Sequence, residues 1–190
     1  MDLENKKLGF IFYGNYNLIN KVISEIEKNI TCKNIFITSI IDTKDMNEEI
    51  IKQIRKISKN KVYFIYDSKI NWEFIKNLDI LILVPCGGDI IYKVANNILE
   101  NNNFNTINII YSFLNNDKPI VLGIDSKDIL SSNAENIGKL LIRKNCFFIP
   151  FKQYNPLTEP FSMRFDYTYI IKTIEHALNK IQIQPIIISL

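Results

Sequence analysis

The chain has 190 residues, 47% of them hydrophobic, which is enough for one substantial core and too few for two. Lys and Arg number 23 against 20 Asp and Glu, and the charges are scattered, which disfavours a nucleic-acid partner. The N-terminus lacks the layout of a signal peptide, and no apolar run approaches the length of a membrane span. We therefore expect a cytoplasmic protein in which residues 1–190 form a single domain, with no membrane partner.

Cysteine and histidine are sparse, and this restricts the chemistry of the chain. Cys32, Cys86 and Cys146 are odd in number, widely spaced and without a CxxC pair, which disfavours both a disulfide framework and a metal centre. The single histidine, His176, is predicted on the polar side of the last helix. Catalytic triads built on histidine are therefore disfavoured.

Short aliphatic runs alternate with segments that carry apolar residues at helical spacing. The aliphatic runs predict strands over residues 8–13, 34–41, 61–66, 79–84, 119–124 and 146–150. The other segments predict helices over residues 18–26, 45–58, 72–76, 90–99, 105–114, 132–141 and 167–180, with a capping box from Ser132 to Glu135. Residues 151–165 contain two prolines and are expected to be irregular. This alternation predicts an α/β fold with a doubly wound, mostly parallel sheet covered on both faces, in a flavodoxin-like or Rossmann-like three-layer arrangement.

The central feature of the sequence is the strand at residues 79–84, which stops abruptly at the loop Pro85-Cys86-Gly87-Gly88-Asp89. We predict that the strand order reverses between the first strand and this one, which brings the Gly14-Asn15 turn beside the loop. Free amides at two helix starts could then hold a phosphate. The alternative is that these glycines only permit tight turns. Neither GxGxxG nor GxxxxGK[ST] occurs, so NAD and ATP are disfavoured as directly bound ligands.

Several side chains near these loops could carry chemistry, and each has a simpler interpretation. Cys86 could be a nucleophile, but packing is the preferred interpretation because such a cysteine usually needs a histidine base. Arg143 and Lys144 stand at a helix C-terminus, where ordinary surface charge is the preferred interpretation. Lys152 and Arg164 flank the irregular segment and could orient a carboxylated ligand, Arg164 with bidentate geometry.

A set of short motifs in the second half of the chain resembles one known family. They are Pro85 to Gly88, Val94 to Asn96, Lys118 to Val121, Asn133 with Asn136 to Gly138, Lys144-Asn145, Pro150 to Gln153, Pro156, Pro160 to Ser162, Thr173 to Leu178 and Gln182 to Pro185. Together they resemble the B subunit of dipicolinate synthase, nearly continuously from about Leu78 to the C-terminus. That family is similar in fold to homo-oligomeric flavin-containing cysteine decarboxylases.

The resemblance implies an oxidoreductase subunit that acts in the last step of dipicolinic acid synthesis during sporulation, in the mother cell of a spore-forming bacterium. Hydroxytetrahydrodipicolinate or its dehydrated form would be oxidised by NADP, which a partner, the A subunit of dipicolinate synthase, would bind in a hetero-oligomer. Two alternatives stay open. One is an FMN-binding module for electron transfer or decarboxylation, and the other is a non-catalytic scaffold for the A subunit.

The resemblance also implies where ligands would lie. The candidate cofactor-binding residues are Gly14, Asn15, Thr38, Ser39, Pro85, Cys86, Gly87, Gly88, Asp89 and Ser126, and the candidate substrate-binding residues are Lys152, Gln153, Ser162 and Arg164. Where relatives have hydroxyl or amide side chains, this chain has Asn15, Gly87, Asp89 and Ile90. A carboxylate near a phosphate is electrostatically unfavourable, so FMN is a possible rather than a required ligand.

Overall fold

The structure is a computed structural model that describes residues 3–30, 35–42, 46–59, 61–65, 72–101 and 105–189. Its strands are β1 (Lys7–Phe12), β2 (Phe36–Ile41), β3 (Val62–Phe64), β4 (Ile80–Cys86), β5 (Ile120–Ser126), β6 (Cys146–Phe148), β7 (Phe151–Gln153) and β8 (Met163–Phe165). Its helices are α1 (Tyr16–Ile30), α2 (Glu48–Ile57), α3 (Trp72–Lys76), α4 (Gly88–Ala95), α5 (Thr106–Asn115), α6 (Ala134–Leu141) and α7 (Ile170–Leu178), with a 3₁₀ turn at Tyr167–Tyr169. Cys32 and the predicted element ends at 34, 45 and 66 lie outside the described residues.

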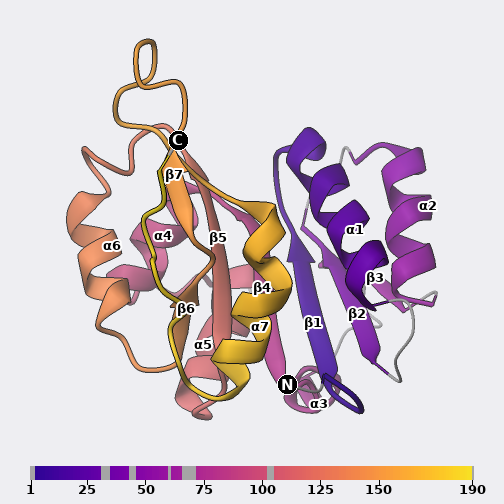
Figure 1. Ribbon diagram of the computed structural model, residues 1–190. Helices are drawn as coiled ribbons and strands as arrows, with labels where there is room; N and C mark the ends of the chain where they lie inside the picture. The colour runs from indigo at the N-terminus through magenta and orange to yellow at the C-terminus, as the bar shows by residue number, and fades with distance from the viewer. Residues whose placement is uncertain are drawn as a thin grey trace.

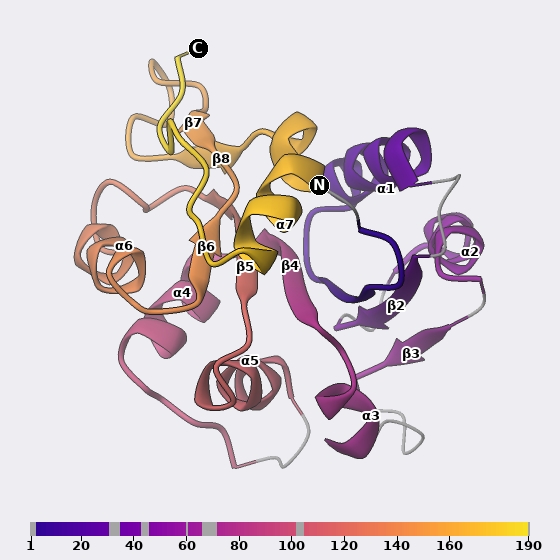
Figure 2. The ribbon, with the colours of Figure 1, turned by 60° about the horizontal axis from the view of Figure 1, so that its bottom comes forward.

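The strands form one sheet in the order β3-β2-β1-β4-β5-β8-β7, and β6 also pairs with β5. Strand β1 lies parallel between β2 and β4, so the strand order reverses between β1 and β4 as predicted. Helices α1, α2 and α7 lie on one side of the sheet, and α4, α5 and α6 lie on the other (Figures 1 and 2). The predicted doubly wound α/β fold is thereby confirmed.

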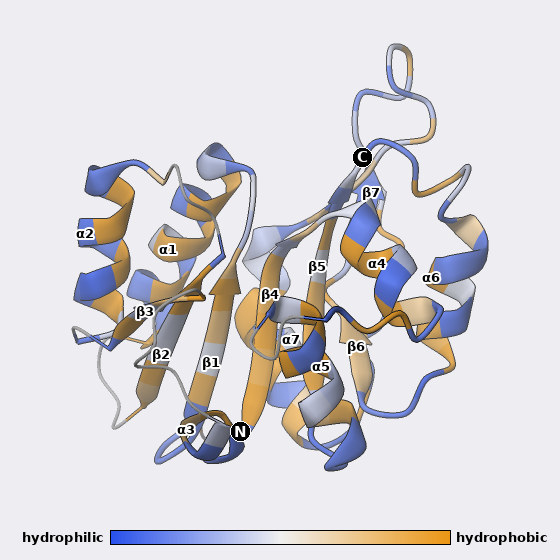
Figure 3. Ribbon diagram, turned by 180° about the vertical axis from the view of Figure 1, so that it is seen from behind, coloured by the Kyte–Doolittle hydropathy of each residue, from blue (hydrophilic) through white to orange (hydrophobic). Residues whose placement is uncertain are grey.

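Burial explains why these segments fold as they do. All seven residues of β4 are buried, as expected for a central parallel strand with helices on both faces. The helices are amphipathic, with their apolar stripes against the sheet and their polar faces outward (Figure 3). Phe10, Phe113 and Phe148 are among the largest fully buried side chains, and they come from both halves of the sequence. One hydrophobic core therefore joins the two halves of the chain.

Three local predictions are wrong. Helix α4 ends at Ala95, four residues before the predicted end at 99. Asn133, not Ser132, is the N-cap of α6, because the Ser132 hydroxyl donates to the carboxylate of Asp128 instead. The segment 151–165, predicted to be irregular, begins and ends with the short strands β7 and β8, which pair antiparallel. The loop between them extends beyond the carboxyl ends of the parallel strands (Figure 1).

The C-terminal tail covers an otherwise open edge of β6. The Gln182 side chain accepts a hydrogen bond from the Phe148 backbone N–H at 2.7 Å and donates one to its carbonyl oxygen at 2.8 Å. Farther along, Ile187 forms a parallel bridge with Phe151. The tail therefore satisfies backbone groups that would otherwise be exposed at a sheet edge.

We expect Gln182→Ala to lower the free energy of unfolding by about 1–3 kcal/mol, because both backbone groups of Phe148 lose their partner. Urea denaturation measures the effect. The control is Gln184→Ala, whose exposed side chain makes no hydrogen bond within the part of the chain that the structure describes. Equal stability of the two variants would contradict this role of Gln182.

Candidate functional site

The carboxyl ends of β1 and β4 meet at one crevice, as predicted for a reversal in strand order. The Tyr13 hydroxyl, just after β1, donates to Asp89 Oδ2 in the first turn of α4 at 3.2 Å. Gly14 has φ +79°, a left-handed conformation that only glycine adopts without strain, and nothing lies within 4 Å of its position for a Cβ. The Gly14-Asn15 turn and the Gly87-Gly88-Asp89 loop therefore lie on the same edge of the sheet.

Asn15 connects this edge to the strand on the far side of β4. Its Oδ1 accepts a hydrogen bond from the Leu18 backbone N–H at 3.3 Å, which caps the start of α1. Its Nδ2 donates to Asp125 Oδ2 at 3.0 Å. Both ends of the Asn15 amide are therefore occupied.

Asp125 fixes the orientation of Arg164, because β8 pairs antiparallel with the last residues of β5. Arg164 Nε lies 2.7 Å from Asp125 Oδ1, and the guanidinium carbon lies 3.7 Å from the centre of the Tyr154 ring. Burial lowers the pKa of Arg164. The hydrogen bond to Asp125 and the charge of Asp125 raise the pKa by more than burial lowers it, so the net shift is upward. The guanidinium is thus held on its Nε edge by Asp125 and on one face by the Tyr154 ring.

A hollow of about 180 Å³ opens beside Arg164. It is lined by Asn15, Asp125, Ser126, Lys127, Tyr154, Glu159, Ser162, Met163 and Arg164. The volume corresponds to roughly six water molecules, which suits a small polar ligand. Among these groups, the arginine that is already paired with Asp125 is the kind of side chain that recognises a carboxylate.

The other predicted substrate-binding residues have different surroundings. Ser162 lines the hollow, but its hydroxyl donates to the carbonyl oxygens of Tyr154 and Glu159. Gln153 donates to the Pro160 carbonyl oxygen at 2.6 Å and stabilises the loop. Lys152 lies in a neighbouring hollow, 3.6 Å from Asp166. Of the four predicted substrate-binding residues, only Arg164 presents an oriented charge to the hollow beside β5.

Behind the Gly87-Gly88-Asp89 loop lies a network of polar side chains around Asp128. Asp128 accepts from Ser126 at 2.5 Å, from Ser132 at 3.0 Å and from Asn133 at 2.8 Å. These bonds lower the pKa of Asp128 although its partial burial acts in the opposite direction. A Cβ on Gly88 would lie 2.7 Å from Asp128 Oδ1 and 2.8 Å from both the Asn133 amide nitrogen and the Ser126 hydroxyl. Ser126 therefore positions the start of α4 and has a structural partner of its own.

Two candidate cofactor residues are not brought to this edge. Thr38 and Ser39 are buried in the middle of β2, opposite Gly9 and Phe10 of β1. The Ser39 hydroxyl is hydrogen-bonded at 2.5 Å to Ser58, which follows the last turn of α2 at the amino-terminal side of the sheet. The expectation that they join the crevice is corrected, because the edge begins only after Ile41.

Cys86 and Pro85 are the last residues of β4 and are buried. Burial raises the pKa of the Cys86 thiol well above its usual value, and the nearby Asp89 adds to this effect. A thiol that stays protonated is a poor nucleophile, which favours the packing interpretation.

Of the two cations at the end of α6, one has a structural role that the sequence did not indicate. Arg143 donates to the Val94 carbonyl oxygen at 2.9 Å and lies over the Tyr111 ring at 5.3 Å, so it joins α4 to α5 and is not ordinary surface charge. Lys144 is exposed and forms an ion pair with Asp117 at 2.8 Å. Neither lies at the crevice.

Sequence reasoning missed several acidic and phenolic groups at the crevice. Asp42 follows β2 and accepts a hydrogen bond from Thr106 at 2.5 Å. Burial raises the pKa of Asp42, and the charges of Glu100 and Asp89 raise it further, against a lowering by Thr106. Burial, followed by the charge of Asp89, raises the pKa of Tyr13 to about 12. The available signal was position, since Asp42 and Asp125 stand at or just after the carboxyl ends of parallel strands.

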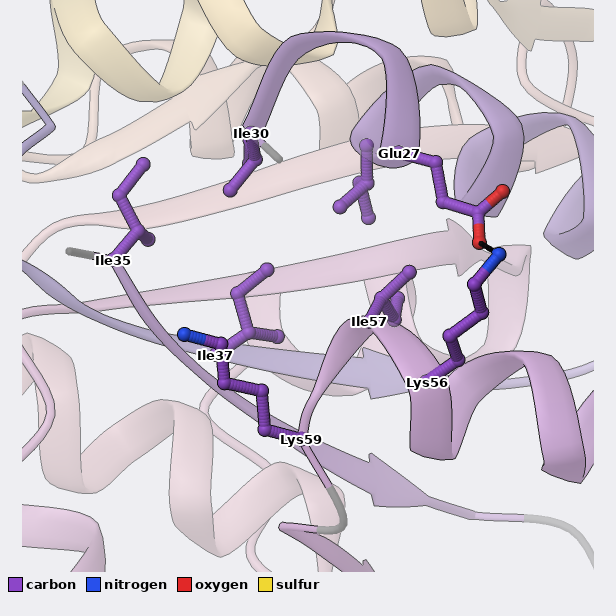
Figure 4. A pocket seen from close by; sticks show the side chains of 8 residues that line it. Glu27, Ile30, Ile35, Ile37, Lys56, Ile57 and Lys59 are labelled. Atoms are coloured by element: carbon purple, nitrogen blue, oxygen red, sulfur yellow. Dashed lines mark ion pairs between the residues drawn. The ribbon is translucent and has the colours of Figure 1, made fainter. Parts of the chain in front are cut away.

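A second hollow, of about 270 Å³, lies at the opposite end of the sheet (Figure 4). Five isoleucines line it, from α1, α2, β2 and the residue before β2, and the ion pair between Glu27 and Lys56 lies at its rim. Ligands of open α/β sheets bind at the carboxyl ends of the strands, so this hollow is not part of the candidate site. Over the residues that the structure describes, no group of three or more His, Cys, Asp or Glu side chains is arranged to hold a metal ion, and no helix is long and apolar enough to cross a membrane.

We expect Gly88→Ala to lower the free energy of unfolding by about 1–3 kcal/mol, because the new methyl group meets three polar side chains at once. Gly138→Ala in α6 is the matched control, since nothing lies within 4 Å of that position. The control is expected to be neutral or to stabilise by about 0.5–1 kcal/mol. Chemical denaturation compares them, and a Gly88→Ala variant as stable as the control contradicts the packing described for the loop.

Comparison with known proteins shows which proteins the chain is similar to over its whole length. No protein-family model matches the sequence. The B subunit of dipicolinate synthase from Bacillus subtilis (strain 168) is 28% identical over 194 residues, which cover 98% of this chain and 96% of the relative. The crystal structure of the dipicolinate synthase B subunit from Bacillus halodurans C aligns with a TM-score of 0.81 at 27% identity, over 100% of this chain and 99% of that one.

More distant structures share the fold alone. A structure of FMN-dependent cysteine decarboxylases aligns with a TM-score of 0.59 at 11% identity, over 93% of this chain and 99% of that chain. A dodecameric FMN-dependent decarboxylase from Escherichia coli O157:H7 aligns with a TM-score of 0.53 at 13% identity, over 71% and 75% of the two chains. The similarity to the two Bacillus proteins extends over nearly the whole length in sequence and in structure, so the chain is similar from end to end to dipicolinate synthase B subunits.

Proposed function

We propose that the chain is one half of an oxidoreductase that forms dipicolinate together with the A subunit of dipicolinate synthase. Hydroxytetrahydrodipicolinate first loses water, and the dehydrated form then loses a hydride to NADP and a proton to solvent, which leaves the aromatic pyridine dicarboxylate. We further propose that this takes place in the cytoplasm of a spore-forming bacterium. The observation that carries the proposal is the oriented Arg164 guanidinium in the hollow beside β5.

The geometry around Arg164 suits one carboxylate of such a substrate. Asp125 holds Nε and Tyr154 covers one face, so the terminal amino groups are restricted to one direction before a ligand arrives. A guanidinium restrained in this way loses little conformational entropy on binding and can pair with a carboxylate in a bidentate manner. The Ser126 hydroxyl and the Asn15 amide line the same hollow. In this proposal the chain binds and orients the dicarboxylate.

The hydride acceptor belongs to the A subunit in this proposal. The chain has no GxGxxG motif after β1 and no GxxxxGK[ST] motif. At the start of α1, Asn15 already caps the helix, which removes an amide that a dinucleotide phosphate would use. We therefore assign NADP to the A subunit, and we expect the isolated chain to be inactive. Self-association is also expected, in line with the dodecameric relative.

Two other functions compete with this proposal. An FMN-binding module for electron transfer or decarboxylation is favoured by the fold shared with FMN-dependent decarboxylases. A scaffold that only stabilises the A subunit is favoured by the burial of Cys86 and the exposed position of His176 on α7. The scaffold leaves the orientation of Arg164 without a purpose.

We expect Arg164→Ala to raise KM for the dicarboxylate between about tenfold and about a hundredfold in the assembled complex, because it removes charge-assisted hydrogen bonds worth roughly 1.5–3 kcal/mol. The assay combines the purified chain with the A subunit and NADP and follows absorbance of the aromatic product. Lys144→Ala is the control, since it removes an exposed cation that pairs with Asp117 far from the hollow.

The outcomes separate the oxidoreductase from the scaffold. A complex that assembles with Arg164→Ala and keeps the KM of the unchanged protein supports the scaffold and contradicts the role of Arg164. Absence of product with every A subunit tested contradicts the oxidoreductase itself. Size-exclusion chromatography of each variant with its partner establishes that assembly is intact.

A further inference from the structure

Two helices begin at the crevice, and FMN would need at least one of their N-termini for its phosphate. The free N–H groups of a helix start and the positive end of its dipole attract anions. Because the chain shares its fold with FMN-dependent decarboxylases, the N-termini of α1 and α4 are the places to test for flavin binding. The question is whether the residues present leave either helix start available.

The start of α1 is already capped. Asn15 accepts from the Leu18 N–H through both its carbonyl oxygen, at 3.2 Å, and its side-chain Oδ1, at 3.3 Å. Its carbonyl oxygen also accepts from the Ile19 N–H at 3.0 Å. The Asn15 amide nitrogen is bound to Asp125, so a phosphate at this position would meet a carboxylate as its neighbour. A phosphate that binds here must first displace these hydrogen bonds. This costs free energy that a phosphate would not lose at an uncapped helix start.

The start of α4 carries its own anion. Its N-cap, Gly87, has no side chain, but Asp89 in the first turn lies back over it, with Oδ1 only 2.8 Å from the position of a Gly87 Cβ. Asp89 Oδ2 accepts from Tyr13 across the crevice at 3.2 Å. The carboxylate therefore lies where the dipole of α4 favours a negative charge, which is the place that a phosphate would take.

The loop cannot retreat to make room for a second anion. Gly88 is packed against Ser126, Asp128 and Asn133, with no space even for a methyl group. The network behind it continues from Asn133 to Asn136 and from Asn136 to Asn96, through hydrogen bonds of 2.9 Å and 2.8 Å. The start of α4 is thereby fixed at its present distance from β1.

The charge balance on the α4 side of the crevice is negative. Asp42 and Asp89 act on each other through their charges, and Glu100 contributes a third carboxylate. The nearby cation, Lys93, already lies 2.5 Å from Glu100. Asp42 and Asp89 therefore have no cation within ion-pair distance among the described residues, in contrast to Asp125, which is paired with Arg164.

We infer that this chain keeps the fold of FMN-dependent decarboxylases but closes the flavin crevice with its own carboxylates, Asp42 and Asp89. The residues do not fit FMN, and the chain works without bound flavin. The negative α4 side excludes the phosphate-bearing cofactor, while the paired arginine on the β8 side leaves room for a small carboxylate. This inference does not depend on the reaction that the complex catalyses.

The test measures FMN binding by the purified chain. Binding is detected as quenching of flavin fluorescence and as flavin absorbance of the preparation. The unchanged protein is expected to be colourless and to leave FMN fluorescence unaltered. Asp89→Asn and Asp42→Asn each remove one charge at nearly constant volume. We expect each to tighten FMN binding about tenfold, and the double variant to bring it into the measurable range.

Glu27→Gln is the matched control, because it removes one negative charge at the opposite end of the sheet (Figure 4). It should bind FMN as poorly as the unchanged protein, and circular dichroism establishes that every variant is folded. A yellow preparation of the unchanged protein, or quenching by it, overturns the inference. A folded double variant that binds no better than the control overturns the assignment to Asp42 and Asp89.

Discussion

Parallel pairing between β1 and β4 is the constraint on which the rest of the structure depends. Because β2 and β3 continue from β1 in one direction and β5 continues from β4 in the other, two helices begin side by side at the carboxyl edge of the sheet. The full burial of β4 fixes this arrangement, since its aliphatic residues pack against helices on both faces. Gly14, Asn15 and the Gly87-Gly88-Asp89 loop owe their positions at this edge to that pairing, and Arg164 is added by the pairing of β8 with β5.

Asp125 divides the edge into two chemically different parts. It accepts from Asn15 with one oxygen and from Arg164 with the other, so it links the start of α1 to β8. On the β8 side the guanidinium faces a small hollow, which suits a carboxylate. On the α4 side the carboxylates of Asp42 and Asp89 repel a phosphate. The two parts of this edge therefore favour different ligands.

Much of the fold could be predicted from the sequence, because buried parallel strands are nearly continuous aliphatic runs and their order follows from right-handed crossovers. The meeting of Gly14 and Asn15 with the Gly87-Gly88-Asp89 loop followed from that topology. The pairing of Arg164 with Asp125 did not, because β8 has only three residues and no periodicity to reveal it. Thr38 and Ser39 were wrongly included among the cofactor residues, because the predicted strand 34–41 ends where β2 ends and already placed them inside the buried strand, before the edge.

We propose that this edge binds a small dicarboxylate and excludes flavin. A crystal structure of the chain grown with dipicolinate and FMN both present tests it most directly. We predict one dipicolinate carboxylate against the Arg164 guanidinium, in the hollow with Asn15 and Ser126, and no FMN between α1 and α4. FMN with its phosphate at the start of either helix, or dipicolinate bound away from Arg164, would contradict it.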